Sequence, residues 1–127
     1  MVEVLVCNEK AVTEQLFNIA GIFMNENSIC IRAMDKEQCL GFCLFEIEES
    51  AARVLYIYPE EDRMLADGLL RTALHVGNER GIDEAFYGDK VSEALLEKIN
   101  FLEEKCEKRL RLQNLFTDCC CCGSAEK

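Results

Sequence analysis

The chain has 127 residues, half of them apolar and only one a proline, so it is long enough for one domain with a hydrophobic core and too apolar for extensive disorder. Its formal net charge of −10 repels phosphate backbones and anionic lipid surfaces, which argues against nucleic acid and membrane partners. Its apolar runs are shorter than the roughly 20 residues of a membrane span, and its N-terminus is too briefly apolar for a signal peptide. Nine cysteines, an odd number, fit a reducing compartment better than a disulfide framework. We therefore expect a cytoplasmic protein.

The first half of the chain contains one helix pattern among four strand patterns. Residues 2–7 form a short β-rich run, and apolar side chains spaced three or four apart predict a helix over residues 9–24. Three extended segments follow, joined by polar turns, at residues 28–33, 39–48 and 52–58. In the second of these, both alternate faces are apolar, which is typical of a central strand that is covered on both sides.

The second half begins with the clearest helix of the chain, residues 65–80. Its apolar stripe ends at Gly81, where a C-cap glycine belongs. Residues 81–87 then predict a strand, residues 91–99 a second amphipathic helix, and residues 101–116 a final hairpin.

This order of elements, with the segment VLYIYPEEDRMLADGLLRTALHVGNERGIDEAFYG and the later LLEKINFLEE, resembles the GNAT N-acyltransferase superfamily. The resemblance covers nearly the whole chain and is strongest from Gly41 to Phe101. It implies an α/β fold, a single GNAT-like domain over residues 1–117 with a mixed, mostly antiparallel sheet and helices on both faces. Residues 118–127 are left as a cysteine-rich C-terminal tail. The resemblance also implies that acetyl-CoA is the acyl donor.

In that family, a pyrophosphate loop of the form Arg or Gln, two residues, Gly, one residue, Gly or Ala follows a strand that ends near a proline. The stretch EEDRMLADGLL takes this place here. The resemblance assigns the backbone of Ile57 and Tyr58 to the pantetheine arm, in a gap between their strand and residues 82–87. It assigns pyrophosphate binding to six consecutive residues: Arg63, Met64, Leu65, Ala66, Asp67 and Gly68.

Two other interpretations of this stretch stay open. Counting back from the leucine-rich helix places Glu61 at the head of the loop and Met64 at its first glycine, where a methionine side chain would obstruct a phosphate. The stretch is also acidic, which weakens an anion site but suits a first helical turn that complements the helix dipole. The acids concerned are Glu60, Glu61, Asp62 and Asp67.

Acyl transfer to an amine needs a base to take the proton of the amine, and often an acid to protonate the departing thiolate. Glu46, at the end of the central strand, is the candidate base, and Tyr87, at the end of the strand over residues 81–87, is the candidate acid. The position of the tyrosine acid of the family falls on Leu96, which cannot donate a proton. The alternative is that Glu46 is a solvated strand end and Tyr87 a half-buried structural residue.

The tail contains the run Cys119-Cys120-Cys121-Cys122, and the spacing of its first and last thiols occurs in zinc ribbons and redox pairs. Because the run has no histidine and no second such pair beside it, no metal site is predicted, and we expect a reduced tail without a ligand. The five other cysteines are expected to pack as small hydrophobic residues: Cys7, Cys30, Cys39, Cys43 and Cys106.

The favoured function is a divergent GNAT-type N-acetyltransferase that moves an acyl group from acetyl-CoA to a small amine. The negative charge of the chain favours a cationic acceptor. One alternative is a non-catalytic GNAT-like binding or interaction protein with a degenerate pyrophosphate loop. The other is a thiol- or metal-handling protein that uses the tail. A homodimer is compatible with the sequence, although no motif specifies one.

Overall fold

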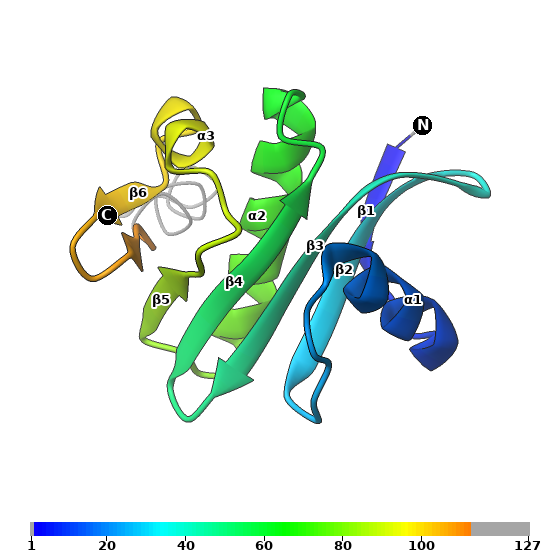
Figure 1. Cartoon of the computed structure of the whole chain (residues 1–127), viewed down its shortest axis with the longest axis horizontal. Coiled ribbons are helices and arrows are strands. Elements are labelled where there is room, and N and C mark those ends of the chain that lie inside the picture. Colours follow the sequence, from blue (N-terminus) through cyan, green and yellow to red (C-terminus); the bar gives the residue numbers. More distant parts are fainter. Residues whose placement is uncertain (1, 113–127) are drawn as a thin grey trace, which may run out of the picture.

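Seven strands form one sheet in the order β1-β2-β3-β4-β5-β7-β6 in the computed structural model, which describes residues 2–112 (Figure 1). The elements are β1 (Val2–Val6), α1 (Lys10–Ala20), β2 (Ser28–Asp35), β3 (Gln38–Glu48), β4 (Ala51–Tyr58), α2 (Arg63–Glu79), β5 (Glu84–Tyr87), α3 (Glu93–Lys98), β6 (Leu102–Glu104) and β7 (Arg109–Leu110). This order of elements is the predicted one. The predicted domain end at residue 117 and the cysteine run of the tail lie outside the described residues.

The sheet is antiparallel except at one place. β1 to β4 pair in chain order as antiparallel neighbours, whereas β4 and β5 are parallel. A parallel pair needs a long crossover connection, and α2 provides it. The predicted final hairpin is confirmed, because β6 and β7 pair as antiparallel strands, and β7 also pairs with β5.

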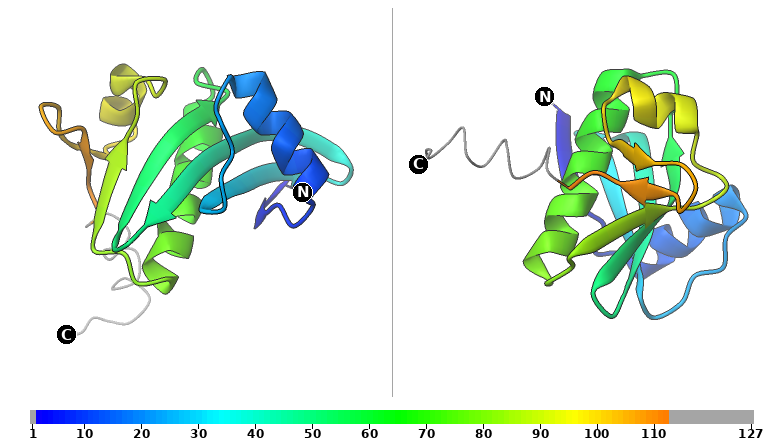
Figure 2. Two further views of the ribbon diagram at one scale, coloured as in Figure 1. Left: turned by 60° about the horizontal axis from the view of Figure 1, so that its bottom comes forward. Right: turned by 90° about the vertical axis from the view of Figure 1, so that its left-hand side faces the viewer.

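The two longer helices cover opposite faces of the sheet (Figure 2). On the face covered by α1, called the α1 face below, Phe17 and Ala20 pack against Cys30, Phe42 and Leu44. The face covered by α2, called the α2 face, carries the larger core, in which the buried stripe of the helix meets side chains of β2, β3, β4 and β5. The stripe consists of Ala66, Leu69, Leu70, Ala73, Leu74 and Gly77. Coverage on both sides explains why the strand pattern of β3 is apolar throughout.

Glycines end both of the longer helices. Gly21 adopts a left-handed conformation with φ of 73°, so α1 stops at Ala20, four residues before the predicted end at residue 24. At the end of α2, Gly81 has φ of 92°, as expected for the predicted terminating glycine. None of the helices within residues 2–112 is long and apolar enough to cross a membrane.

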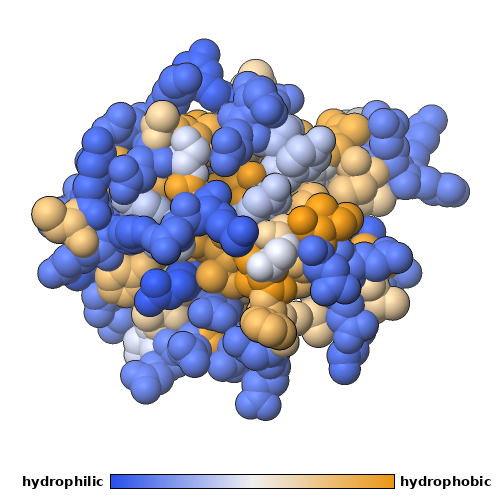
Figure 3. Space-filling model, viewed as in Figure 1, coloured by the Kyte–Doolittle hydropathy of each residue, from blue (hydrophilic) through white to orange (hydrophobic). Residues whose placement is uncertain are grey.

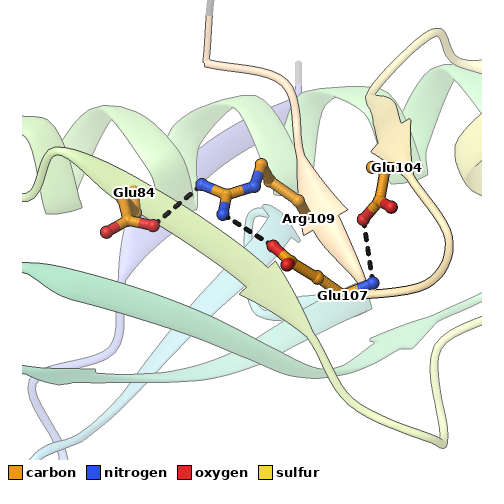
Figure 4. Close-up of polar contacts among 4 residues, drawn as sticks. All are labelled: Glu84, Glu104, Glu107 and Arg109. Atoms are coloured by element: carbon orange, nitrogen blue, oxygen red, sulfur yellow. Dashed lines mark hydrogen bonds and ion pairs between the residues drawn. The ribbon is translucent and has the colours of Figure 1, made fainter.

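The C-terminal hairpin is tied to β5 through Arg109 (Figure 4). Its guanidinium contacts Glu84 at 2.8 Å and Glu107 at 2.9 Å, and it lies 5.2 Å above the ring of Phe86. The backbone N–H of Glu107 also donates to Oε1 of Glu104 at 2.8 Å. Because β5 and β7 share a single register pair, Phe86 with Arg109, these side-chain contacts supplement a short backbone ladder.

Candidate functional site

The strands β4 and β5 diverge halfway along β4. Their parallel register runs only from Ala51 with Glu84 to Val54 with Tyr87, and the N–H of Gly88 donates to the carbonyl of Val54 at 2.8 Å. Beyond this point β4 continues to Tyr58, while the chain from Gly88 turns towards α3 (Figure 1). The predicted gap between these two strands is therefore confirmed, since they are not paired along the full length of β4.

A β-bulge lies at the point of divergence. Val54 pairs with Phe45 and Tyr56 pairs with Leu44, so Leu55 is an extra residue in β4. A bulge bends its strand and increases the local twist, which turns the second half of β4 away from β5. As a result, Leu55 and Tyr56, although consecutive, both pack against the core of the α1 face.

The predicted pantetheine-binding residues form the end of β4. The side chain of Ile57 is 2% exposed and belongs to the core of the α2 face, whereas Tyr58 is 51% exposed. The ring of Tyr58 lies 5.6 Å from that of Phe42, which also stacks on Tyr56 at 5.8 Å. A ligand in the gap can thus contact only the backbone of Ile57, as the resemblance implies.

Sequence reasoning missed the importance of Gly41 for this strand end. A β-carbon at Gly41 would overlap the carbonyl oxygen of Tyr58 and lie 2.8 Å from Cδ of Pro59. Only glycine allows β3 and the end of β4 to approach so closely. The available signal was a glycine inside an otherwise apolar strand, which often marks a close backbone approach.

The stretch predicted as a pyrophosphate loop is helical from Arg63 onward. The side chain of Asp62 caps α2 by accepting a hydrogen bond from the N–H of Leu65 at 3.1 Å, and the N–H of Ala66 donates to the carbonyl of Asp62 at 2.9 Å. The N–H groups of Asp67 and Gly68 point along the helix interior, where each has a partner four residues earlier. Within the first turn, the N–H groups of Arg63 and Met64 are thus left for an anion, and the assignment of all six residues to pyrophosphate binding stays a prediction.

The capping role of Asp62 agrees with the alternative interpretation of the acidic stretch as a helix start. An aspartate three residues before Leu65, the first leucine of the helix, is the sequence signal for such a cap. Asp67 lies one turn into the helix and not at its terminus, and it forms an ion pair with Arg71 at 3.2 Å. The helix N-terminus therefore already holds a carboxylate, supplied by the protein itself.

A cleft of about 320 Å³ separates the start of α2 from α3. Two cationic side chains, Arg63 and Lys98, line it together with two acidic ones, Glu60 and Glu61. The remaining lining residues are Ser92, Ala94 and Leu95. The cleft offers two cations to the phosphates of a ligand, but the nearby acids offset much of their attraction.

The two predicted catalytic residues lie on opposite faces of the sheet. Glu46 pairs with Arg53 and Tyr87 pairs with Val54, and consecutive residues of a strand point to opposite sides. Tyr87 belongs to the core of the α2 face, whereas Glu46 accepts a hydrogen bond at 3.3 Å from Asn25, in the loop after α1. The structure does not bring Glu46 and Tyr87 together as the base and acid of one site.

Tyr87 is held by its surroundings on the α2 face. Its side chain is 1% exposed, and its hydroxyl donates to Oε2 of Glu93 at 2.8 Å. Burial, followed by the hydrogen bond and charge of Glu93, raises the pKa of Tyr87 to about 12. Tyr87 therefore stays protonated at neutral pH. Leu96, at the expected position of the tyrosine acid of the family, is fully buried in the same core.

Glu46 lies in a cavity of about 460 Å³ at the β3–β4 hairpin. Glu48, Glu49, Arg53 and Phe86 also line this cavity, so acids outnumber the single cation. On the face seen in Figure 1, hydrophobic side chains reach the surface between hydrophilic ones (Figure 3). The three glutamates that line the cavity suit a small cationic ligand.

No family model and no curated protein matches the chain. Solved structures do match it. An aminoglycoside acetyltransferase from an uncultured soil metagenomic sample, solved with sisomicin, is 14% identical with a TM-score of 0.57, over 82% of this chain and 91% of that one. A GNAT-family acetyltransferase from Streptococcus pneumoniae is 17% identical with a TM-score of 0.53, over 79% and 84% of the two chains. The PaiA N-acetyltransferase from Thermoplasma acidophilum, solved with coenzyme A, is 18% identical with a TM-score of 0.50, over 80% and 66%.

These likenesses show that the chain has the α/β fold of GNAT acetyltransferases. The predicted resemblance and the predicted fold class are thereby confirmed at the level of the fold. At such low identity, what each of these proteins binds or acetylates is a property of that protein. The activity of this chain has to be argued from its own residues.

Proposed function

We propose that the protein binds acetyl-CoA in the opening between β4 and β5 and transfers the acetyl group to a small cationic amine. The observation that carries this proposal is the divergence of the two strands after Val54 and Tyr87. The β4 backbone from Leu55 to Tyr58 has no strand partner on that side among the described residues. It can therefore hydrogen-bond the amides of an extended pantetheine arm, as a missing strand would.

The electrostatics of the α2 N-terminus support only weak binding of the cofactor. Arg63 and Lys98 can pair with the phosphates in the cleft beside α3. The carboxylate of Asp62 opposes them, because it already occupies the N–H of Leu65 and places a negative charge at the helix end. We therefore expect affinity for acetyl-CoA in the tens of micromolar or weaker, on the order of −6 kcal/mol.

Glu46 would act as the base that takes the proton of the attacking amine. Its cavity at the β3–β4 hairpin carries further acids that attract a cation. We assign Tyr87 no part in this step, because its hydroxyl donates to Glu93 on the other face of the sheet. A structural role for Tyr87 is thus the better interpretation.

A second candidate is a non-catalytic binding protein with the same fold. The capped α2 terminus favours it, since Asp62, Glu60 and Glu61 together disfavour a pyrophosphate. In this case the opening between β4 and β5 takes another ligand or none. The third hypothesis, thiol or metal handling by the tail, concerns residues outside those described.

Calorimetric titration with acetyl-CoA, on the wild type and on Asp62→Ser, distinguishes the first two candidates. Serine keeps the cap on the N–H of Leu65 but removes the charge, so the variant should bind about two- to fivefold more tightly. The matched control is Asp83→Asn, which removes one charge in the loop after α2, near the opposite end of that helix, and should leave affinity unchanged. If neither the wild type nor Asp62→Ser gives a heat of binding, the transferase proposal is contradicted and the non-catalytic one is favoured.

A further inference from the structure

Two cysteine side chains, Cys7 and Cys30, lie opposite each other where β1 leads into α1. The register that pairs Val6 with Ile31 continues by one residue, since the N–H of Cys7 donates to the carbonyl of Cys30 at 2.8 Å. Directly opposed residues in a hydrogen-bonded antiparallel pair have Cα atoms about 5.5 Å apart. This separation falls within the range of about 4.4–6.8 Å that a disulfide spans.

Both side chains point to the α1 face and share one small core with Phe17 and Ala20 of α1. Cys7 is 8% exposed and Cys30 is 1% exposed, and both thiols are free. The thiol of Cys7 donates to the carbonyl of Glu9 at 3.6 Å, and that of Cys30 donates to the carbonyl of Ile31 at 3.9 Å. Burial raises the pKa of Cys30 to about 12, and the nearby Cys7 and Cys39 act in the same direction. Arg32 has the opposite effect on that pKa.

A surface cavity of about 600 Å³ reaches both residues. Polar residues, among them Asn8, Lys10 and Thr13, line it beside the two cysteines. A small polar oxidant can therefore approach the pair without disrupting the fold. The exposed Cys39 and Cys106 have easier access to solvent, but no opposed thiol faces either of them within residues 2–112.

We propose that Cys7 and Cys30 form an oxidation site, in which hydrogen peroxide converts the two thiols into an intramolecular disulfide. The thiolate of Cys7 attacks one peroxide oxygen, the O–O bond breaks, and hydroxide leaves and takes a proton to become water. Cys7 is then a sulfenic acid. The sulfur of Cys30 attacks that of Cys7, an S–S bond forms as the S–O bond breaks, and the hydroxide with the proton of Cys30 leaves as a second water. The two thiols lose two electrons and the peroxide gains them.

The disulfide would enclose the whole of α1 and the loop that follows it, residues 7–30. A cross-link of this kind removes freedom from the unfolded chain. Oxidation should therefore raise the melting temperature of the protein, and a thiol reductant should reverse the rise. This site does not depend on acetyl-CoA binding, so its test is independent of the test of the proposed function.

The sequence allows a direct test on the full chain. Trypsin cuts after Lys10 and Arg32, so Cys7 lies in peptide 1–10 and Cys30 in peptide 11–32, and each peptide has no other cysteine. The reduced protein is treated with hydrogen peroxide, its remaining thiols are alkylated in guanidinium, and the digest is analysed without reduction by mass spectrometry. We expect peptides 1–10 and 11–32 to be linked, with the loss of two hydrogens, as the major product within residues 1–112.

Two variants and one unfolded reference sample show whether the linked product depends on Cys30 and on the folded structure. Cys30→Ser should abolish this product and leave Cys7 as a sulfenic acid that dimedone labels, whereas Cys43→Ser, which removes a buried thiol on the other face of β3, should leave the product intact. Protein oxidised while unfolded in guanidinium should give mixed pairings. The proposal is overturned if Cys7 and Cys30 stay fully alkylated while Cys39 and Cys106 are oxidised, or if the folded and unfolded proteins give the same pairings.

Discussion

Gly41 of β3 touches Tyr58 at the end of β4 so closely that a side chain at Gly41 would displace the carbonyl of Tyr58. This contact positions the strand end that borders the opening between β4 and β5. Because the obstructing atom belongs to the backbone, it cannot move aside without moving β4. Gly41→Ala should therefore lower the free energy of unfolding by about 1–3 kcal/mol, as measured by urea denaturation.

The control for this substitution is Gly68→Ala. Among residues 2–112, the nearest atom that a β-carbon at Gly68 of α2 would meet outside its own helix is Cγ2 of Val4, at 4.0 Å. Alanine is favoured over glycine within a helix, so this change should stabilise the protein by about 0.5–1 kcal/mol. Equal effects of the two substitutions would show that Gly41 is not sterically constrained.

Asp62 should contribute to stability through its cap as well as limit anion binding. Asp62→Ala leaves the N–H of Leu65 without its side-chain acceptor and should destabilise the protein by about 1 kcal/mol. Asp62→Ser, which retains an acceptor, should restore most of this loss. Thermal or urea unfolding of both variants measures the difference, and identical losses would mean that the charge of Asp62, and not its hydrogen bond, is what matters.

Tyr87 should make stability fall with pH above its ordinary pKa of 10.0, because its pKa in the folded protein is raised to about 12. Between these values the folded state keeps the phenolic proton and the unfolded state releases it. The unfolded state then binds fewer protons, so the free energy of unfolding decreases as pH rises through this window. Urea unfolding at several pH values from 9 to 11 should show a steeper decline for the wild type than for Tyr87→Phe. Parallel declines would contradict the assignment.

Glu46→Gln tests the proposed base. If Glu46 takes the proton of the amine, this substitution should reduce acetyl transfer by about 10²-fold or more, with the affinity for acetyl-CoA unchanged. The assay supplies small polyamines as acceptors and measures the released CoA by chromatography. Thiol reagents are unsuitable because they also react with the cysteines of the protein. Glu48→Gln is the matched control, since it removes a charge from the same cavity two residues further along β3. Equal losses in the two variants would assign the effect to the charge of the cavity.

Arg109 should stabilise the C-terminal hairpin through three contacts, of which Figure 4 shows the two ion pairs, with Glu84 and Glu107. Arg109→Met removes its ion pairs with Glu84 and Glu107 and its stacking on Phe86, and should lower the free energy of unfolding more than the loss of a single exposed ion pair does. Glu107→Gln removes the charge from one exposed pair and should cost only a few tenths of a kcal/mol. Hydrogen exchange of the Tyr87 amide, which donates to the carbonyl of Lys108, should speed up in the first variant more than in the second.

The order of the strands and helices could be predicted from the sequence because periodicity, turns and terminating glycines are local signals. The stripe that α2 buries is visible in its spacing, and Gly81 marks its end. The prediction erred where a local signal was weak or misassigned. Apolar residues continue beyond Gly21, so their spacing predicts a helix to Met24, whereas α1 ends at Ala20. The loop pattern includes Asp62, so it predicts the start of α2 two residues late.

The sequence by itself thus determined the fold class, the order of elements and the place of the opening between β4 and β5. The tertiary structure alone decided which side chains share a site, because that depends on strand register. Glu46 and Tyr87 align with Arg53 and Val54, two consecutive residues of β4 that point to opposite faces. Cys7 and Cys30, separated by a whole helix, are opposed for the same reason. No local pattern records a register between distant strands, since it is set by how their two faces pack against α1 and α2.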